Sequence, residues 1–435
     1  MPMEHIRNYI AHVKSIKGFM INKKKNILHN KKSNHVTVES SKHLGIILGA
    51  FAIIFLLQVP FIDRCGINDD EQSEADAIKS ATISDETDGL FIADFRINDL
   101  GVPHGKRYDS SERAIRVMDM VVFDGALYVG GGDYGTNAGP VDMLRYNIAA
   151  GEWEQLGSLP DEEVNEFAVI GGVLTVPGTD PRDIGWDKCN YYYLENGEWK
   201  MKSTLPGAPH CWDITGYGGK IFAAIQYGGD GSAYYVAVSE DGGESFFVIP
   251  LTDENGVPAA RSAVGRYYHL LHINGDLYAY CENKLYKYNG ERFAFAYDWQ
   301  GKVTPGNAAG IAKDLGSVVY TDTAMYFSTT ALYECADPAS PAQLALPSIE
   351  TVNDLYVFGG ELYVLAVERK SAAENIIRVY KFSSGEFSIV AEIVRETSAV
   401  CLAVTDDRVY LGLASNNKHA DNGRVIEIEI HDKSN

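Results

Sequence analysis

One short pattern returns from about Gly89 to the end of the sequence, and it limits the possible folds more than any other feature. It is a two-residue turn followed by a strand-like run, and its copies read DGALYVGG, GGVLTVPG, GGKIFAAI, NGDLYAYC, DTAMYFST, GGELYVLA and DDRVYLGL. Their second turn residues fall at 125, 172, 219, 275, 323, 360 and 407, at intervals of 47, 47, 56, 48, 37 and 47. Because no helical period interrupts the copies, they predict a repetitive all-β fold.

An apolar run precedes each turn and further strand-like segments follow it, so one repeat supplies up to four strands. Such repeats are typical of a β-propeller, and we predict seven blades over residues 89–435, with six or eight as the alternatives. The last repeat ends early, at RVIEIEIHD. We expect the segment LFIADFRI, at 90–97, to supply the missing strand and close the ring, which removes open sheet edges.

Two segments resemble known propeller families. In the first repeat Gly130–Gly132 end the second strand and Tyr146 precedes Trp153 by seven residues, which is similar to a kelch repeat; later repeats lose this pattern. The resemblance implies that the glycines allow tight strand packing and that the two aromatic rings fill the space between blades. Residues 239–246 (SEDGGESF) resemble the Asp-box of sialidase-type propellers, which shapes a hairpin turn remote from the active site. Neither resemblance implies an activity.

The N-terminal part of the chain has the pattern of a membrane anchor. Residues 44–62 contain no charged side chain, and a helix of about 1.5 Å per residue over this length matches a bilayer core. Residues 1–43 hold nine Lys and Arg against two Glu, so the positive-inside rule places this tail in the cytoplasm and the C-terminal part outside. We favour an uncleaved transmembrane signal anchor over a cleaved signal peptide, because no A-x-A-like site follows. Residues 63–88, acidic and polar, are interpreted as a flexible stalk.

Charge is segregated along the chain. The sequence has 38 Lys and Arg and 59 Asp and Glu, and without the basic tail 29 basic and 57 acidic residues remain, a net charge of −28. A domain this acidic does not bind nucleic acid through its phosphates and attracts cations or basic partners instead. The absence of any Asn-x-Ser/Thr sequon favours a bacterial source for an extracytoplasmic domain of this size.

The repeat also aligns one position that resembles a level of a channel wall. We call the second turn residue of each repeat its turn anchor. The residue six positions before each turn anchor is polar or ionisable, and the residue after it is apolar in every repeat. The aligned polar residues are Asp119, Glu166, Asp213, His269, Ser317, Asp354 and Cys401. Carboxylates that converge on one space raise one another's pKa or bind a hard cation such as Ca²⁺. We predict a substrate or cation site at the channel mouth, with a merely hydrated channel wall as the alternative.

Three positions earlier, each repeat has a residue expected on the loop that leads into an inner strand. Arg116, His210 and Arg266 occur at this position and are candidates for holding an anionic or polyhydroxyl ligand. Loop charge without a function is the alternative.

The second repeat has the most unusual loop, residues 177–190, which contains Asp180, Arg182, Asp183 and Trp186. An aromatic ring among carboxylates and an Arg suits a sugar, because it offers a stacking surface and bidentate hydrogen bonds. Asp180, Asp183 and Asp213, with His210, are the candidate acid and base groups for glycoside hydrolysis. The alternative is that Trp186 fills the space between blades and that the acidic loop is only a turn.

Two classes of function remain open. The first is a cell-surface module that binds a glycan or an envelope protein. The second is a carbohydrate-active enzyme, a glycoside hydrolase or lyase, which needs two carboxyl groups across one pocket. We favour the binding module, because no nucleotide-binding loop, G-x-S-x-G elbow or H-E-x-x-H motif occurs. The cysteines show no zinc-ligand spacing, so the only cofactor considered is Ca²⁺ in the central channel.

Overall fold

A computed structural model of the protein describes residues 96–105, 116–132, 139–181, 188–207, 209–226, 233–260, 269–303, 316–320, 323–327, 331–348, 350–371, 373–414 and 421–430. All of them lie in one compact unit, Thr87–Asn435. The predicted tail, membrane helix and stalk, residues 1–88, lie outside these ranges. No helix within these ranges is long and apolar enough to span a membrane.

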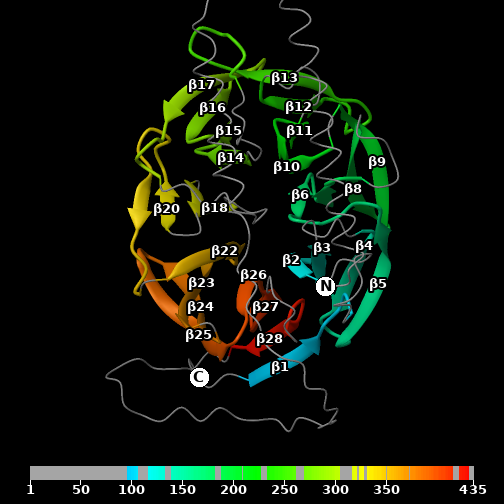
Figure 1. Cartoon of the computed structure of the whole chain (residues 1–435), viewed down its shortest axis with the longest axis vertical. Helices are drawn as coiled ribbons and strands as arrows, with labels where there is room; N and C mark the ends of the chain where they lie inside the picture. Colours follow the sequence, from blue (N-terminus) through cyan, green and yellow to red (C-terminus); the bar gives the residue numbers. More distant parts are fainter. Residues whose placement is uncertain are drawn as a thin grey trace, which may run out of the picture. The chain divides into compact units, whose positions relative to one another are not determined.

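The described chain is built from groups of four strands, ordered from a first strand to a fourth, and Figure 1 shows the first strands nearest the centre. The first strands are β2 (Arg116–Phe123), β6 (Ala168–Ile170), β10 (Cys211–Tyr217), β14 (His269–Ile273), β18 (Gly316–Tyr320), β22 (Thr351–Phe358) and β26 (Ser398–Val404). The second strands are β3 (Ala126–Gly132), β7 (Val173–Pro177), β11 (Lys220–Ile225), β15 (Asp276–Cys281), β19 (Thr323–Phe327), β23 (Glu361–Ser371) and β27 (Arg408–Ala414).

The outer half of each group is formed by its third and fourth strands. The third strands are β4 (Val141–Asn147), β8 (Lys188–Glu195), β12 (Tyr235–Ser239), β16 (Lys284–Tyr288), β20 (Leu332–Cys335), β24 (Glu374–Ser383) and β28 (Val425–Glu429). The fourth strands are β5 (Glu152–Leu159), β9 (Glu198–Pro206), β13 (Phe247–Thr252), β17 (Phe293–Asp298), β21 (Ala342–Leu344), β25 (Glu386–Arg395) and, from the N-terminal side, β1 (Arg96–Gly101).

Neighbouring groups meet at the centre through their first strands. β6 contacts β10, β10 contacts β14, and the series continues through β18, β22 and β26 to β2. Two groups also join at their outer edges, where β13 pairs with β17 in parallel at Leu251–Phe293 and Thr252–Ala294. The prediction of an all-β, propeller-like fold is therefore confirmed.

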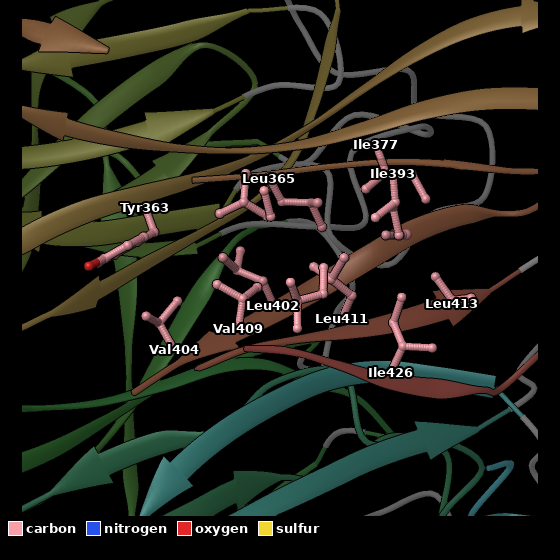
Figure 2. Close-up of a cluster of buried hydrophobic side chains, with 14 of the residues drawn as sticks. Tyr363, Leu365, Ile377, Ile393, Leu402, Val404, Val409, Leu411, Leu413 and Ile426 are labelled. Atoms are coloured by element: carbon pink, nitrogen blue, oxygen red, sulfur yellow. The ribbon is translucent and has the colours of Figure 1, made fainter. Parts of the chain in front are cut away.

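The hydrophobic core lies between adjacent sheets. Figure 2 shows one such layer, in which Leu365 and Ile377 from one sheet face Leu402, Val409 and Leu411 from the next. Leu402, Val409 and Leu411 are completely buried. Because each buried Leu or Val contributes about 1.5–3 kcal/mol, this packing holds one sheet to its neighbour.

Glycines permit the closest approach between sheets. A Cβ atom at Gly130 in β3 would lie 2.6 Å from Val164 of the next group, and one at Gly412 in β27 would lie 2.6 Å from Val117. Both glycines occupy the same place in their groups, five residues after the turn anchor. At this position a side chain would collide with the neighbouring group, so glycine permits the close approach.

Large aromatic side chains and one polar turn tie the outer strands to their neighbours. The Trp153 ring lies 5.1 Å from the Tyr146 ring, and its indole N–H donates to the Leu100 carbonyl at 2.8 Å. In residues 239–246 the Ser239 hydroxyl accepts from the Gly243 amide at 2.7 Å, and the Gly243 carbonyl accepts from the Tyr191 hydroxyl at 3.2 Å. The turn therefore contacts the preceding group as well as stabilising itself.

The N-terminal strand completes the last sheet. β1 pairs antiparallel with β28, and the Asn98 amide donates to the Glu427 carboxylate at 2.8 Å. Asp99 and Arg424 form an ion pair across the same seam. The expected closing strand therefore exists. Its described part, Arg96–Gly101, overlaps the predicted segment 90–97 at Arg96 and Ile97, and residues 90–95 lie outside the described ranges.

Shortly after β1, the chain places His104 against β3. The imidazole is 5% exposed, and neither of its nitrogens has a hydrogen-bond partner among the residues that the structure describes. A Cβ atom at Gly131 would lie 2.7 Å from Nε2, so the ring occupies the space that the glycine leaves open. Burial lowers the pKa of His104 to about 4, and the Asp142 carboxylate opposes this only in part.

We expect Leu411→Ala to lower the free energy of unfolding by about 3 kcal/mol, because it leaves a cavity in a fully buried layer. The measurement is urea denaturation followed by circular dichroism. Val257→Ala is the control, since Val257 is 56% exposed and its truncation should cost less than about 0.5 kcal/mol. Equal losses in the two variants would show that the inter-sheet layer does not carry the stability.

A pH prediction follows from His104. Because the pKa of His104 is lower in the folded chain, the unfolded chain binds a proton in a pH range where the folded chain does not. The free energy of unfolding therefore falls as the pH drops below about 6.5 toward 4. Between pH 7.5 and pH 5 this amounts to about 2 kcal/mol. His104→Gln should remove that part of the pH dependence, measured by urea denaturation at both pH values. An unchanged difference between the two pH values would contradict the assignment.

Candidate functional site

The aligned polar position sits on the inner strands, immediately after a bulge. In β2, β10 and β22 the pairing register skips one residue just before Asp119, Asp213 and Asp354. A bulge adds a residue to one strand and turns the following side chain away from the regular alternation. The three carboxylates are consequently buried, at 5–7% exposure, rather than displayed in an open channel.

Each of these carboxylates accepts a hydrogen bond from an amide in, or immediately before, the first strand of the next group. Asp119 Oδ2 accepts from the Phe167 amide at 2.7 Å, and Asp213 Oδ2 accepts from the Leu270 amide at 2.7 Å. Asp354 Oδ2 accepts from the Leu402 amide at 2.8 Å. The donor always follows the aligned position of the next repeat by one residue, so the contact repeats with the sequence.

The second oxygen binds the strand that carries the carboxylate. Asp354 Oδ1 accepts from the Leu355 amide at 2.9 Å, and Asp213 likewise accepts from the Ile214 amide. A first strand is the inner edge of its sheet, so some of its backbone amides have no neighbouring strand to accept their hydrogen bonds. One carboxylate accepts from an amide of its own first strand and from an amide of the next group. We call this arrangement the aspartate bridge.

The other members of the aligned position differ from one another. Glu166 is half-buried and His269 is buried, with its Nδ1 3.9 Å from Asp213 Oδ2. Cys401 is completely buried, and a Cβ atom at Gly412 would lie 2.5 Å from its sulfur. The side chain of Ser317 lies outside the description. The aligned position is therefore polar in sequence but not one uniform wall of ligand groups.

Burial also changes the acidity of one bridge. It raises the pKa of the Asp213 carboxyl to about 7, although the hydrogen bonds from the Leu270 and Ile214 amides favour the ionised form. A carboxyl of this kind is a plausible general acid by pKa alone. Its oxygens, however, are directed at backbone amides.

A second group of polar side chains lies at the rim where the first strands begin, which we call the leading rim. Asp180 follows β7, and its neighbour Thr179 forms a bridge with His210, which precedes β10. The Asp180 amide donates to the Pro209 carbonyl at 2.9 Å. These backbone contacts hold the loops of two adjacent groups together and bring Asp180 beside His210.

The side chains of this rim group form a compact arrangement. His210 Nδ1 lies 3.2 Å from Asp180 Oδ1, and the two side chains are 13% and 15% exposed. The imidazole stacks on the Trp212 ring with centroids 4.5 Å apart and an interplanar angle of 20°. Asp180 has a φ of 50°, an uncommon conformation for a residue with a side chain. The structure thus brings together two residues from the predicted site, Asp180 and His210.

Other predicted site residues are less closely grouped or lie outside the described ranges. Arg116 opens β2 at the same rim, in the group before Asp180. Arg182, Asp183, Trp186 and Arg266 lie outside the described residues. Their roles stay predictions.

A buried acidic segment behind this rim was not predicted. Asp161, Glu162 and Glu163 are consecutive and at most 4% exposed. Asp161 Oδ1 accepts from the Tyr192 hydroxyl at 2.6 Å and from the Asn190 amide at 3.1 Å. The sequence DEEVN reads as an exposed loop, and only the asparagine and tyrosine in β8 hint at buried partners. The Glu162 amide donates to the Thr179 carbonyl at 3.0 Å, so this buried segment is joined to the loop that carries Asp180.

The described ranges contain no group of three or more His, Cys, Asp and Glu side chains placed to hold a metal ion. The Ca²⁺ hypothesis therefore gains no support from these residues. The bridging oxygens of Asp213 and Asp354 are turned to backbone amides instead.

Comparison with known proteins adds little to this picture. No family model matches the sequence, and no curated protein matches it. Solved structures with a similar fold include a chain of the mitotic checkpoint complex, with 10% identity and a TM-score of 0.46, covering 82% of this chain and 100% of that chain. The RRP9 WD40 repeats give 9% identity and a TM-score of 0.45, covering 79% of this chain and 100% of that chain.

Sqt1 from Saccharomyces cerevisiae is a further match, with 13% identity and a TM-score of 0.40, covering 69% of this chain and 81% of that chain. Similarities this distant indicate no function, and the fold is assigned from the strand pairing.

The aspartate bridge makes a direct prediction at Asp354. Asp354→Ala removes the acceptor for both the Leu402 and Leu355 amides and should cost about 3 kcal/mol. Asp354→Asn keeps one carbonyl oxygen and should cost clearly less. Urea denaturation gives the stabilities, and hydrogen exchange by mass spectrometry reports the Leu402 amide. If the alanine variant matched the asparagine variant and the Leu402 peptide kept its protection, the bridge would have no energetic role.

Proposed function

We propose that this chain is a membrane-anchored binding module whose ligand site is the leading rim around Asp180 and His210. In this proposal each four-strand group is one blade of a seven-bladed propeller. The first blade is kelch-like and residues 239–246 form an Asp-box, both serving the scaffold. The apolar segment 44–62 is the anchor, with the basic tail in the cytoplasm and the propeller outside a bacterial cell.

The Asp180, His210 and Trp212 arrangement is the observation that carries this proposal. A residue in a sparsely populated backbone conformation persists when its surroundings hold it there, and such residues concentrate at functional sites. Here the strained residue is an acid that faces an imidazole, and the imidazole is fixed on an indole. Both polar side chains keep some exposure, so they remain available to a ligand at the rim.

The chemistry of the rim favours a ligand with hydroxyl groups or a positive charge. An acid, an imidazole and an indole can accept, donate and stack, which suits a glycan or a polar segment of an envelope protein. The net charge of −28 outside the tail further favours a neutral or basic partner over an anionic one. For a neutral ligand with hydroxyl groups, Arg116 of the neighbouring blade would donate further hydrogen bonds.

Binding is favoured over hydrolysis for a geometric reason. A glycosidase needs two carboxyl groups that face one another across a bond of the substrate. Among the candidate acids in the described ranges, Asp213 directs its oxygens to the Leu270 and Ile214 amides, and Asp180 faces His210. The remaining candidate, Asp183, lies outside the described residues.

The test is a glycan array, together with pull-down of envelope proteins, using the full chain in detergent. Asp180→Asn and His210→Ala should each reduce binding about tenfold or more, because each removes a polar group that contacts the ligand. The melting temperature should stay near that of the wild type.

Lys220→Ala is the matched control. Lys220 lies opposite Tyr217, at the end of β10 away from His210, and forms an exposed ion pair with Glu240. It should leave binding unchanged. A ligand that binds both rim variants as tightly as the wild type would contradict this site. Hydrolysis of a bound glycan would instead establish the enzymatic alternative.

A further inference from the structure

We propose that two copies of this chain associate through the outer edge of β25, in an antiparallel pairing related by a two-fold axis. β25 is the fourth strand of its sheet, and no strand in the described part of the chain pairs with its outer edge. It is ten residues long, Glu386–Arg395. An edge of this length presents unpaired amide and carbonyl groups that can bind another strand.

Several other outer strands carry features that block such pairing. β9 contains Lys200 and Lys202 and ends at Pro206, and β21 has only three residues. β13 and β17 cover each other. Lysine, proline and short length are the usual protections of an open edge. β25 contains no Lys, Pro or Gly, and six of its ten residues are apolar.

The two charged ends of β25 have no partner among the described residues. Within these ranges neither Glu386 nor Arg395 forms an ion pair or a side-chain hydrogen bond, and the Arg395 Nε is buried without an acceptor. By contrast Glu392, within the same strand, pairs with Arg378. An acid at one end and a base at the other thus remain available to an external partner.

The register places these two charges on the same face of the sheet. Arg395 pairs with Asn375, and Glu386 pairs with Ser383. Asn375 and Ser383 are eight residues apart on β24, and residues separated by an even number lie on one face of a strand. Residues directly opposite each other in a strand pair lie on the same face, so Glu386 and Arg395 lie on one face of the sheet as well. The bulge at Val390 makes this possible, because it adds one residue to β25 and shifts the alternation of its side chains by one position.

A second copy is therefore the partner that fits. When two identical strands pair antiparallel about a two-fold axis near Val390, Glu386 of each copy lies opposite Arg395 of the other. Phe387 then lies opposite Val394, which is 53% exposed in the single chain. The axis is perpendicular to the sheet, so it keeps both charges on the shared face. The pairing gives two ion pairs and two apolar pairs by symmetry.

The test uses charge reversal in the full chain, purified in detergent and weighed by native mass spectrometry and light scattering. The wild type should be a dimer. Glu386→Arg and Arg395→Glu should each raise the dissociation constant about tenfold or more, because each reversal acts at two symmetric positions. The double variant, with both reversals, should restore the wild-type constant, since the opposite charges face each other again.

Glu198→Arg on β9 is the matched control and should have no effect on association. Circular dichroism confirms that the single variants fold. Rescue by the double variant would show that Glu386 of one copy faces Arg395 of the other, which a contact elsewhere on the chain would not produce. A wild-type chain that is monomeric up to its solubility limit would overturn the proposal, as would a dimer that tolerates both single reversals or a double variant that stays monomeric.

Discussion

The arrangement of the sheets depends on how the backbone amides of the inner strands find hydrogen-bond acceptors. Each first strand is the edge of a sheet, and its inward amides face neighbouring edges instead of a paired strand. The aspartate bridge meets this need by joining two amides from adjacent sheets with one carboxylate, as Asp354 does for Leu355 and Leu402. A buried amide without an acceptor costs about 1–3 kcal/mol, so the bridge stabilises the contact between adjacent sheets at their inner strands.

Much of this architecture is predictable from the sequence, because the repeat is a direct consequence of it. The turn anchors, the apolar runs and the short last repeat predict four-strand groups and a closing N-terminal strand. The alternation of a polar residue with an apolar one, as at Asp213 and Ile214, correctly locates the inner strands. What the repeat cannot predict is where the carboxylates point, because a one-residue bulge before Asp213 redirects the side chain and leaves no mark in the sequence.

The candidate site is predictable only in part for a related reason. The pairing of Asp180 with His210 joins two loops that are 30 residues apart, and it depends on a bridge between backbone segments. Composition identifies both as polar loop residues but not as neighbours. Asp161 shows the opposite failure, since an acidic run that reads as solvent-exposed is buried against Tyr192. Carboxylates in this domain therefore divide into those that hold the scaffold and those at the rim.

The closing strand has a mechanical consequence. β1 is the first strand that the structure describes, and a pull on its N-terminal end would act on it at Arg96. β1 lies antiparallel to β28 with five register pairs, and a pull along its length loads those pairs together instead of opening them one by one. Shear of this kind resists force far better than unzipping. In the proposed membrane-anchored arrangement, a pull on the N-terminal end of β1 would thus have to break these register pairs together.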